Sequence, residues 1–329
     1  MNTYIGIDFG GTKLLIGEID DKGNVLSSKR YATGINNQEY ATNYILECLE
    51  DYKEHVGFIG TPLAAGVGIV GIVDHIHGIW NSMDHTVVNP IHLGELITEK
   101  LGIPAVIDND VKSATCAELL FGQGKISDNF IYINVGTGLA AGFVIDGKIL
   151  RGAHNNAGEV GHNVVDISRM ETCICGRKGC VEGVVSGFGF NAQATSLLGK
   201  YETKLNISDD SKVNAQEIFE LAKQNDPLCT VLVDQAIKNL SALIMNLVRV
   251  TDPDAIILGG GVVRDGELLS LVEKELCPSA MRGVVNGIKL SNFDSAYVGL
   301  IGAGAIAYRY ITTMNSDGGI LNENNSCKR

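Results

Sequence analysis

Three cysteines and a histidine in the middle of the chain have the types and spacing of metal ligands. Cys173, Cys175 and Cys180 follow a C-x-C-x4-C pattern, and His162 lies upstream of them. Three thiolates and one imidazole make a closed tetrahedral zinc site. The glycines between the cysteines allow the tight turns that bring several thiolates to one ion. The sequence therefore predicts a structural zinc site.

Two acidic residues bracket these ligands. Glu159 lies shortly before His162, and Glu182 shortly after Cys180. The zinc could stabilise a loop that presents both carboxylates to a polar ligand. Alternatively, it could stabilise the loop without any role for the carboxylates in binding. Structural zinc contributes on the order of 10 kcal/mol to folding, so both interpretations can hold together.

The N-terminal segment predicts a β-meander whose first turn could bind phosphate. We expect strands at 3–8, 14–19 and 24–29, joined by tight turns. Gly10, Gly11 and Thr12 form the first turn, where backbone N–H groups and a hydroxyl can approach an anion. Asp8 ends the first strand and could hold Mg²⁺ or its waters. An ordinary hairpin with a capping aspartate is the alternative.

Residues 129–150 repeat this arrangement. A predicted strand leads into the turn Gly136-Thr137-Gly138, a second strand, an Asp-Gly hairpin and a third strand. Such a repeat indicates internal duplication. Two halves facing each other would bring their Gly/Thr turns to opposite sides of one cleft, where both could close on a polyphosphate.

Asn109 and Asp110 lie where a predicted strand, 105–107, passes into a predicted helix, 110–121. Ligands of α/β sheets bind at the carboxyl ends of strands, so Asp110 could be the base that accepts a hydroxyl proton in phosphoryl transfer. Asn and Asp are also common helix caps, and the residues alone leave both interpretations open.

The G-x-G-x-x-G at Gly66 to Gly71 lies inside a predicted buried strand, 64–73. A dinucleotide fingerprint needs a strand-to-helix turn, so we do not expect one here. Gly259-Gly260-Gly261 follows another predicted strand, 255–258, and could let a flat base or ribose lie on bare backbone, or could form a tight turn. Further helices are expected at 38–52, 93–101, 226 to before Pro253, and 300–311, followed by a disordered polar tail, 314–329.

Bulk properties narrow the class of protein. The 329 residues allow two domains. The formal net charge of −12 argues against nucleic acid or anionic membrane as the main partner. The N-terminus lacks a signal-peptide pattern, and the apolar stretch 64–73 is too short to cross a bilayer. The five cysteines outside the zinc pattern are scattered, which is typical of a reducing cytoplasm.

Taken in order, these motifs resemble the ROK family of sugar kinases from Thr3 to about Tyr310. The resemblance implies a duplicated α/β fold of the actin/hexokinase-like (ribonuclease H-like) type, with two domains around a central cleft. It implies ATP, Mg²⁺ and structural Zn²⁺ as cofactors and a small-molecule sugar as substrate. We expect a small domain at 1–110, completed by the helix at 300–312, and a larger domain at 111–299 that carries the zinc loop.

The resemblance also assigns roles to single residues. Asp110 would take the proton from the 6-hydroxyl of the sugar. Sugar contacts would come from Asn109, Gly71, Glu159, His162 and Glu182. His162 would bind zinc through one ring nitrogen and face the sugar with the other. The nucleotide would be held by Asp8, Gly10, Gly11, Thr12, Lys13, Thr137, Gly138, Gly260 and Gly261. A cytoplasmic homodimer is expected.

Departures from the family pattern leave the sugar open. Lys112 stands where an asparagine is usual and Val70 where a proline is usual, and Met83-Asp84-His85 replaces a common Pro-Asn-Leu. The second Gly/Thr turn also continues with less glycine than usual. Glucose is the default, and allose, fructose, mannose or an N-acylated amino sugar remain open.

Two rival functions are a sugar-responsive repressor and a catalytically silent sugar-binding module. A repressor of this family carries a helix-turn-helix domain ahead of the kinase-like region, and the eight residues up to Asp8 leave no room for one. The presence of Asp110, Asp8 and both Gly/Thr turns argues against a silent module.

Overall fold

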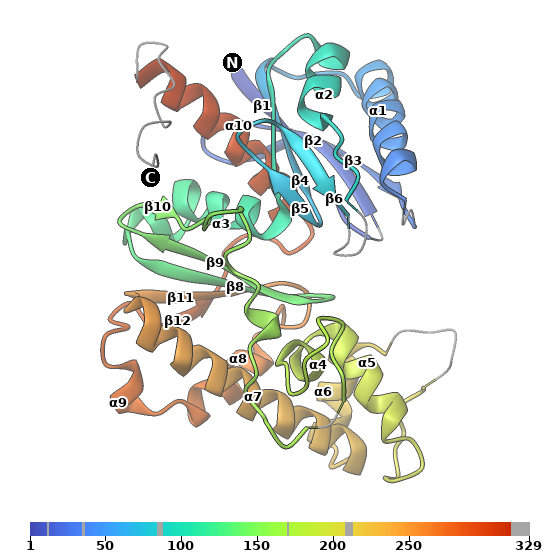
Figure 1. Ribbon diagram of the computed structural model, residues 1–329, viewed down its shortest axis with the longest axis vertical. Helices are drawn as coiled ribbons and strands as arrows, with labels where there is room; N and C mark the ends of the chain where they lie inside the picture. Colours follow the sequence, from blue (N-terminus) through green and yellow to red (C-terminus); the bar gives the residue numbers. More distant parts are fainter. Residues whose placement is uncertain (12, 35–36, 84–87, 170, 208–212, 317–329) are drawn as a thin grey trace. The chain divides into compact units, whose positions relative to one another are not determined.

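The fold is described from a computed structural model that covers residues 1–11, 13–34, 37–83, 88–169, 171–207 and 213–316. The chain divides into two compact units (Figure 1). Unit 1 comprises Met1–Phe121, Gly152–Asn156 and the residues from Ala296 onward, and unit 2 comprises Gly122–Arg151 and Ala157–Ser295. The first boundary follows Phe121 instead of Asp110, because the helix that begins at Asp110 packs against the C-terminal helix of unit 1.

Unit 1 contains a mixed five-stranded sheet with the order β3-β2-β1-β4-β7. Its strands are β1 (Asn2–Phe9), β2 (Lys13–Ile19), β3 (Val25–Ala32), β4 (Thr61–Ile69) and β7 (Ala105–Asn109). The first three strands form the predicted antiparallel meander, and β4 and β7 run parallel to β1. The carboxyl ends of β1, β4 and β7 therefore lie at the same edge of the sheet.

Alternation along β1 directs side chains to two faces of this sheet. Ile5, Ile7 and Phe9 are buried in a core shared with α1 (Gln38–His55) and α2 (Leu93–Leu101). Tyr4 points to the other face, where its ring meets Tyr308 of α10 (Val298–Ser316) at 5.2 Å. The helix α3 (Asp110–Phe121) also packs on α10. This is the pattern expected of a sheet covered on both faces.

The glycines of the G-x-G-x-x-G stretch serve packing and a turn. A Cβ on Gly66 would overlap the carbonyl of Ala303 in α10, so glycine allows helix and sheet to approach closely. The strand ends at Ile69, which corrects the predicted strand 64–73. Gly71 follows with a φ of +102°, a conformation that glycine adopts readily. The chain then forms the hairpin β5 (Ile72–Asp74) and β6 (Ile79–Ser82).

Unit 2 repeats the strand order of unit 1 as β10-β9-β8-β11-β12. Its strands are β8 (Phe130–Val135), β9 (Leu139–Ile145), β10 (Lys148–Ile149), β11 (Ala255–Gly259) and β12 (Ile288–Leu290). As in unit 1, the first strand pairs antiparallel with the second and parallel with the fourth. The duplication predicted from the two strand–turn–strand segments is confirmed.

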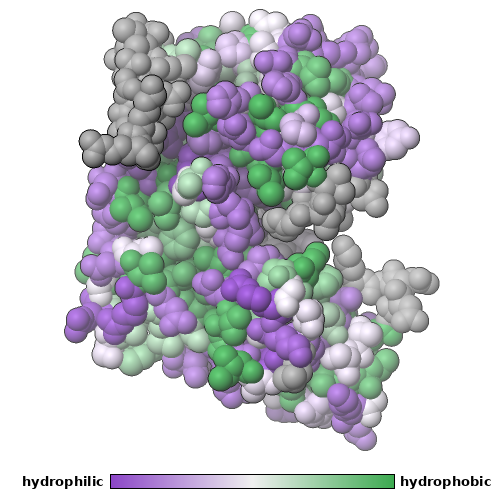
Figure 2. All heavy atoms as spheres, viewed as in Figure 1, coloured by the Kyte–Doolittle hydropathy of each residue, from purple (hydrophilic) through white to green (hydrophobic). Residues whose placement is uncertain are grey.

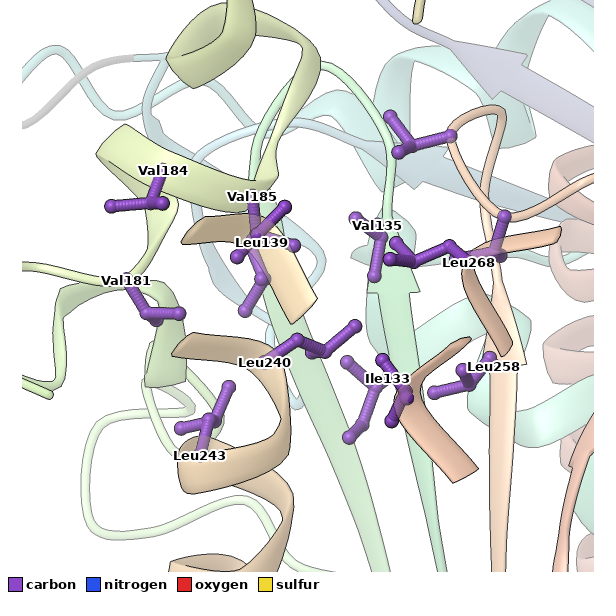
Figure 3. Close-up of a cluster of buried hydrophobic side chains, with 14 of the residues drawn as sticks. Ile133, Val135, Leu139, Val181, Val184, Val185, Leu240, Leu243, Leu258 and Leu268 are labelled. Atoms are coloured by element: carbon purple, nitrogen blue, oxygen red, sulfur yellow. The ribbon is translucent and has the colours of Figure 1, made fainter. Parts of the chain in front are cut away.

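Helices of unit 2 close a large apolar core over this sheet. They are α4 (Glu182–Val185), α5 (Gly187–Ser196), α6 (Ala215–Lys223), α7 (Pro227–Thr251), α8 (Glu267–Glu275) and α9 (Pro278–Met281), with 3-10 turns at Gln123–Lys125 and Val160–His162. Figure 3 shows Leu139 of the sheet near Val185, and Val181, Val184 and Leu243 of α7 belong to the same core. This packing fixes the segment around Glu182.

The helix α7 is long and apolar enough to cross a membrane by length and composition alone. More than half of its most apolar window, 56%, is buried within the protein. Its buried residues run from Leu228 to Val248, and the side chain of Asp226 caps the helix by accepting the N–H of Cys229. Hydrophilic residues are spread over the surface in Figure 2. We conclude that α7 is a core helix.

The C-terminal helix is longer than predicted. It begins at Val298 and continues to Ser316, so the first three residues of the expected disordered tail, 314–316, are helical. The rest of that tail, 317–329, lies outside the described residues, as do Thr12 and the segment 84–87, which includes Asp84 and His85.

Candidate active site

The first Gly/Thr turn places a buried acid beside a lysine. Asp8 is 7% exposed, and its Oδ2 lies 3.3 Å from Nζ of Lys13. Burial raises the pKa of Asp8, although Lys13 acts to lower it. Its carboxylate also lies against Gly299 in the first turn of α10, where any Cβ would overlap it. The helix N-terminus and the lysine offset part of the cost of burying this negative charge.

Gly10 and Gly11 complete this turn in different ways. The N–H of Gly10 donates to the carbonyl of Lys13 at 2.9 Å and closes the turn. A Cβ on Gly11 would meet nothing within 4 Å, so space remains above it. Thr12, which was predicted to hold phosphate, lies outside the described residues.

Asn109 and Asp110 occupy the junction of β7 and α3, at the carboxyl edge of the sheet. The Oδ1 atom of Asn109 accepts the N–H groups of Val111 at 3.0 Å and Lys112 at 3.3 Å. Asn109 therefore caps α3, and its amide nitrogen is the group that could donate to a ligand. Oδ1 of Asp110 accepts the N–H of Val111 at 2.9 Å, which orients the carboxylate at the start of the helix.

The second Gly/Thr turn is supported by α5 and holds an acid directly beside it. The carbonyls of Gly136 and Thr137 accept the N–H groups of Gly187 and Phe188, respectively. These bonds fix the turn, and Thr137 is exposed. Oε2 of Glu182 accepts the N–H of Leu139 at 2.9 Å. Glu182 therefore lies at the turn that was predicted to bind phosphate, as well as beside the cysteine cluster.

His162, Cys173, Cys175 and Cys180 come together as predicted. Their ligand atoms all lie within 4.8 Å of one another. Nδ1 of His162 is 3.5 Å from Sγ of Cys173, and Sγ of Cys175 is 3.5 Å from Sγ of Cys180. Zinc–sulfur bonds of about 2.3 Å in a tetrahedron require sulfurs about 3.8 Å apart. The donor set and its spacing fit Zn²⁺.

Backbone turns and an arginine hold this cluster. Gly176 and Gly179 have φ values of +83° and +80°. Arg177 donates to the carbonyl of His162 at 2.6 Å. Although burial acts to raise it, hydrogen bonds from Arg177 and the neighbouring thiols lower the pKa of Cys175 to about 6. Burial raises the pKa of Cys180 to about 12. One thiolate is thus already favoured near neutral pH, and a cation would favour the others.

The Gly158–His162 turn is pressed onto β9. A Cβ on Gly158 would overlap the carbonyl of Ala141, and one on Gly161 would overlap that of Leu139. These two glycines explain the spacing of the motif, because the turn can lie on the strand only without side chains there. Glu159 is half-buried between them. With Nδ1 of His162 toward the cysteines, Nε2 remains for another ligand.

The triple glycine after β11 combines a tight turn with an open backbone. Gly260 has a φ of +94°, and a Cβ there would overlap the carbonyl of Val135. Gly261 has open space on its Cα, and its carbonyl accepts Nε2 of Gln216 at 2.8 Å. Beside it lies a cavity of about 300 Å³, lined by Gln216, Phe219, Glu220, Lys223, Val262, Asp265 and Glu267.

Sequence reasoning missed the lining of this cavity. Its residues come from α6, from the turn after β11 and from the adjoining start of α8, and α6 is far from the other two in the sequence. Lys223 bridges Glu220 and Glu267, at 2.9 Å from each. An Asn-capped helix start at Asn214 was a signal for α6, but nothing in the sequence linked that helix to the glycines.

Comparison with known proteins identifies the family. A sequence model of the ROK family matches residues 4–309, so the chain belongs to the ROK family. It is 28% identical over 294 residues to a glucokinase of Halalkalibacterium halodurans, covering 86% of this chain and 88% of that protein. It is 30% identical over 282 residues to an N-acetylmannosamine kinase of Escherichia coli, covering 83% of this chain and 88% of that protein.

A solved structure extends the comparison to the fold. The ROK family glucokinase of Streptomyces griseus, in complex with glucose and AMPPNP, has a TM-score of 0.73 and 28% identity. The match covers 93% of this chain and 99% of that one. The predicted ROK-family sugar kinase, its enzyme class and the duplicated actin/hexokinase-like fold are confirmed.

Proposed function

We propose that the protein transfers the γ-phosphoryl group of ATP to the 6-hydroxyl of a hexose, with Asp110 as the general base. The observation that carries the proposal is the position of Asp110. It begins α3 at the carboxyl end of β7, at the same edge of the parallel strands as Asp8 of β1. Ligands of α/β sheets bind at this edge.

In the proposed reaction, Asp110 accepts the proton as the 6-hydroxyl oxygen bonds to the γ-phosphorus. The bond between that phosphorus and the β,γ-bridging oxygen breaks, and ADP leaves. The backbone N–H groups of the two Gly/Thr turns and the ammonium group of Lys13 would hold the phosphates. Asp8 would hold Mg²⁺, which neutralises phosphate charge in such reactions. Positioning and charge neutralisation supply most of the catalysis.

Sugar hydroxyls would be held by Asn109, Glu159, His162 and Glu182, beside Gly71. The cysteine cluster would bind structural Zn²⁺ together with Nδ1 of His162. That arrangement fixes the tautomer so that Nε2 carries the proton and donates to a hydroxyl oxygen. The adenosine end of the nucleotide would lie along Gly260 and Gly261, and the adjoining cavity of about 300 Å³ supports this assignment.

The sugar itself is the next question. Glucose is our first candidate, because relatives with this name match most of the chain. An N-acylated amino sugar is the second, because a relative of 30% identity is named N-acetylmannosamine kinase.

The cysteines of the described residues are all free of disulfides, which supports a reducing cytoplasm. We propose a homodimer, which light scattering after size exclusion would test.

A coupled ADP-release assay tests the proposal on glucose, allose, fructose, mannose and N-acetylmannosamine under one set of conditions. We expect kcat/KM to single out one sugar. Asp110→Asn should lower kcat on that sugar roughly 10³-fold, while calorimetry shows nearly unchanged sugar binding. The fold should survive, because an amide oxygen can still accept the N–H of Val111. Asp234→Asn, at an exposed position of α7, is the matched control. Normal turnover of Asp110→Asn would remove Asp110 from this role.

A further inference from the structure

A short stretch between β10 and the Gly158–His162 turn belongs to unit 1. Residues Gly152–Asn156 group with unit 1, whereas the chain on both sides of them groups with unit 2. Within this stretch, Nδ2 of Asn155 donates to the carbonyl of Val73 at 3.0 Å and to Oδ1 of Asp108 at 3.2 Å. One amide group thus joins the stretch to β5 and to β7.

Asp108 makes this contact relevant to the active site. It is only 1% exposed, and a buried carboxylate needs hydrogen-bond donors around it. Oδ1 of Asp108 also accepts the backbone N–H of Asn109 at 2.9 Å. The orientation of this carboxylate therefore bears directly on the peptide that leads into Asn109 and Asp110.

The backbone of Asn155 restricts which residue can make the contact. Its φ of +54° lies in the left-handed region, which asparagine, aspartate and glycine adopt most readily. Glycine would keep the backbone and lose both hydrogen bonds. Aspartate would keep the shape but would place a second carboxylate beside Asp108. Among these three residues, only asparagine suits the backbone and also donates to a buried acid.

We propose that Asn155 is a positioning residue for phosphoryl transfer. Its amide ties the middle of β5 to the last but one residue of β7, and the acceptor-side residues Gly71, Asn109 and Asp110 adjoin these two strands. It also anchors the chain just before the turn that carries Glu159 and His162. This role rests on the proposed function, because it concerns the geometry between the sugar hydroxyl and its base.

The test compares two asparagines with left-handed backbone. Asn225 has a φ of +60° and follows α6 in unit 2, so Asn225→Gly and Asn225→Asp measure the general cost of such changes. We expect Asn155→Gly to lower kcat roughly tenfold to a hundredfold through misplacement of the base. Asn155→Asp should lower it further. The KM for ATP of the Asn155 variants should stay within about twofold of the wild-type value. The kcat of both Asn225 variants should also stay within about twofold of the wild-type value.

Amide hydrogen exchange gives a readout that does not require turnover. The N–H groups of Asn109, Val111 and Lys112 are bonded to side chains at the β7–α3 junction. Asn155→Gly should speed their exchange roughly tenfold, because their local support is weakened. Asn225→Gly should leave them unchanged.

The outcomes separate the two proposals. If the wild type phosphorylates a hexose, and Asn155→Gly matches Asn225→Gly in both kcat and exchange, the positioning role is wrong and the proposed function stands. If the wild type phosphorylates none of the sugars, the proposed function fails. In that case amide hydrogen exchange alone tests whether Asn155 anchors the β7–α3 junction. Unchanged protection in Asn155→Gly overturns this anchoring, and faster exchange supports it.

Discussion

The two sheets of this protein share a strand order but carry different chemistry at equivalent positions. Asp8 is the last but one residue of β1, and Asn134 is the last but one residue of β8. Asp8 pairs in register with Gly68 of β4, and Asn134 pairs with Gly259 of β11. One half therefore has an acid where the other has a neutral amide. Duplication repeated the scaffold, and the charges differ between the copies.

The later elements differ as well. In unit 1, β7 leads into Asn109 and Asp110 at the start of α3. In unit 2, β12 ends at Leu290, and the N–H of the following Ser291 donates to the carbonyl of Leu258. The cysteine cluster lies in unit 2, within the long segment between β10 and β11. The proposed acid–base and Mg²⁺ chemistry therefore lies in unit 1, and the proposed zinc in unit 2.

The largest expected effects on turnover come from placing an amide at Asp8 and an acid at Asn134. Asp8→Asn removes the charge proposed to hold Mg²⁺, so kcat should fall roughly 10²–10³-fold. Asn134→Asp adds a negative charge beside the second turn. It should mainly raise the KM for ATP, roughly tenfold, through repulsion of the phosphates. Steady-state kinetics at saturating Mg²⁺ measures both, and equal effects of the two variants on kcat would contradict the comparison.

The pH dependence of stability supplies a second check on Asp8. Burial raises its pKa above the ordinary value of 3.8, so the folded state binds the proton more tightly than the unfolded state. The free energy of unfolding should therefore fall as the pH rises from 3.8 through the raised pKa of the folded state. Asp8→Asn lacks this loss, so its Tm relative to the wild type should be higher at neutral pH than at pH 3. A Tm difference that is constant with pH would contradict the burial argument.

Local pattern carried enough information for the strands and for the duplication. The meander of unit 1, the helix at 93–101 and the cluster of Cys173, Cys175 and Cys180 all depend on near neighbours in sequence, so their patterns were readable. Gly71 was placed inside a strand, because an apolar run does not show where the chain reverses into a hairpin. The cavity beside Gly261 and the contacts of Asn155 depend on residues distant in sequence, which periodicity cannot bring together.

Removing one metal ligand should disturb unit 2 and spare unit 1. Cys175→Ser takes away the thiol whose pKa is lowered to about 6, so we expect a metal-poor protein by elemental analysis. Sugar affinity should fall roughly tenfold to a hundredfold, since His162 loses its fixed orientation. Cys277→Ser, which changes an exposed thiol outside the cluster, is the control.

Trp80 reports on unit 1 in the same experiment. It is the single tryptophan of the chain, and it is buried in β6. Its emission maximum should be the same in Cys175→Ser and in the wild type, because the disturbed loop belongs to unit 2. Full zinc occupancy in Cys175→Ser would refute the assignment of Cys175 as a ligand, and a shifted emission would show that the damage is not confined to unit 2.

The smallest expected effect concerns the acid beside the second turn. A Cβ on Gly138 would lie 2.8 Å from Oε2 of Glu182, so Gly138→Ala should push the carboxylate off the N–H of Leu139 without unfolding the protein. Loss of a charge-assisted hydrogen bond should lower kcat/KM roughly tenfold. In Gly136→Ala the nearest atom to the new Cβ is 3.5 Å away, so this neighbour should stay close to the wild type. Equal kinetics of the two variants would show that Glu182 does not act through this turn. Of the two Gly/Thr turns, the first, with Asp8 and Lys13, would then be the one that depends on charged side chains.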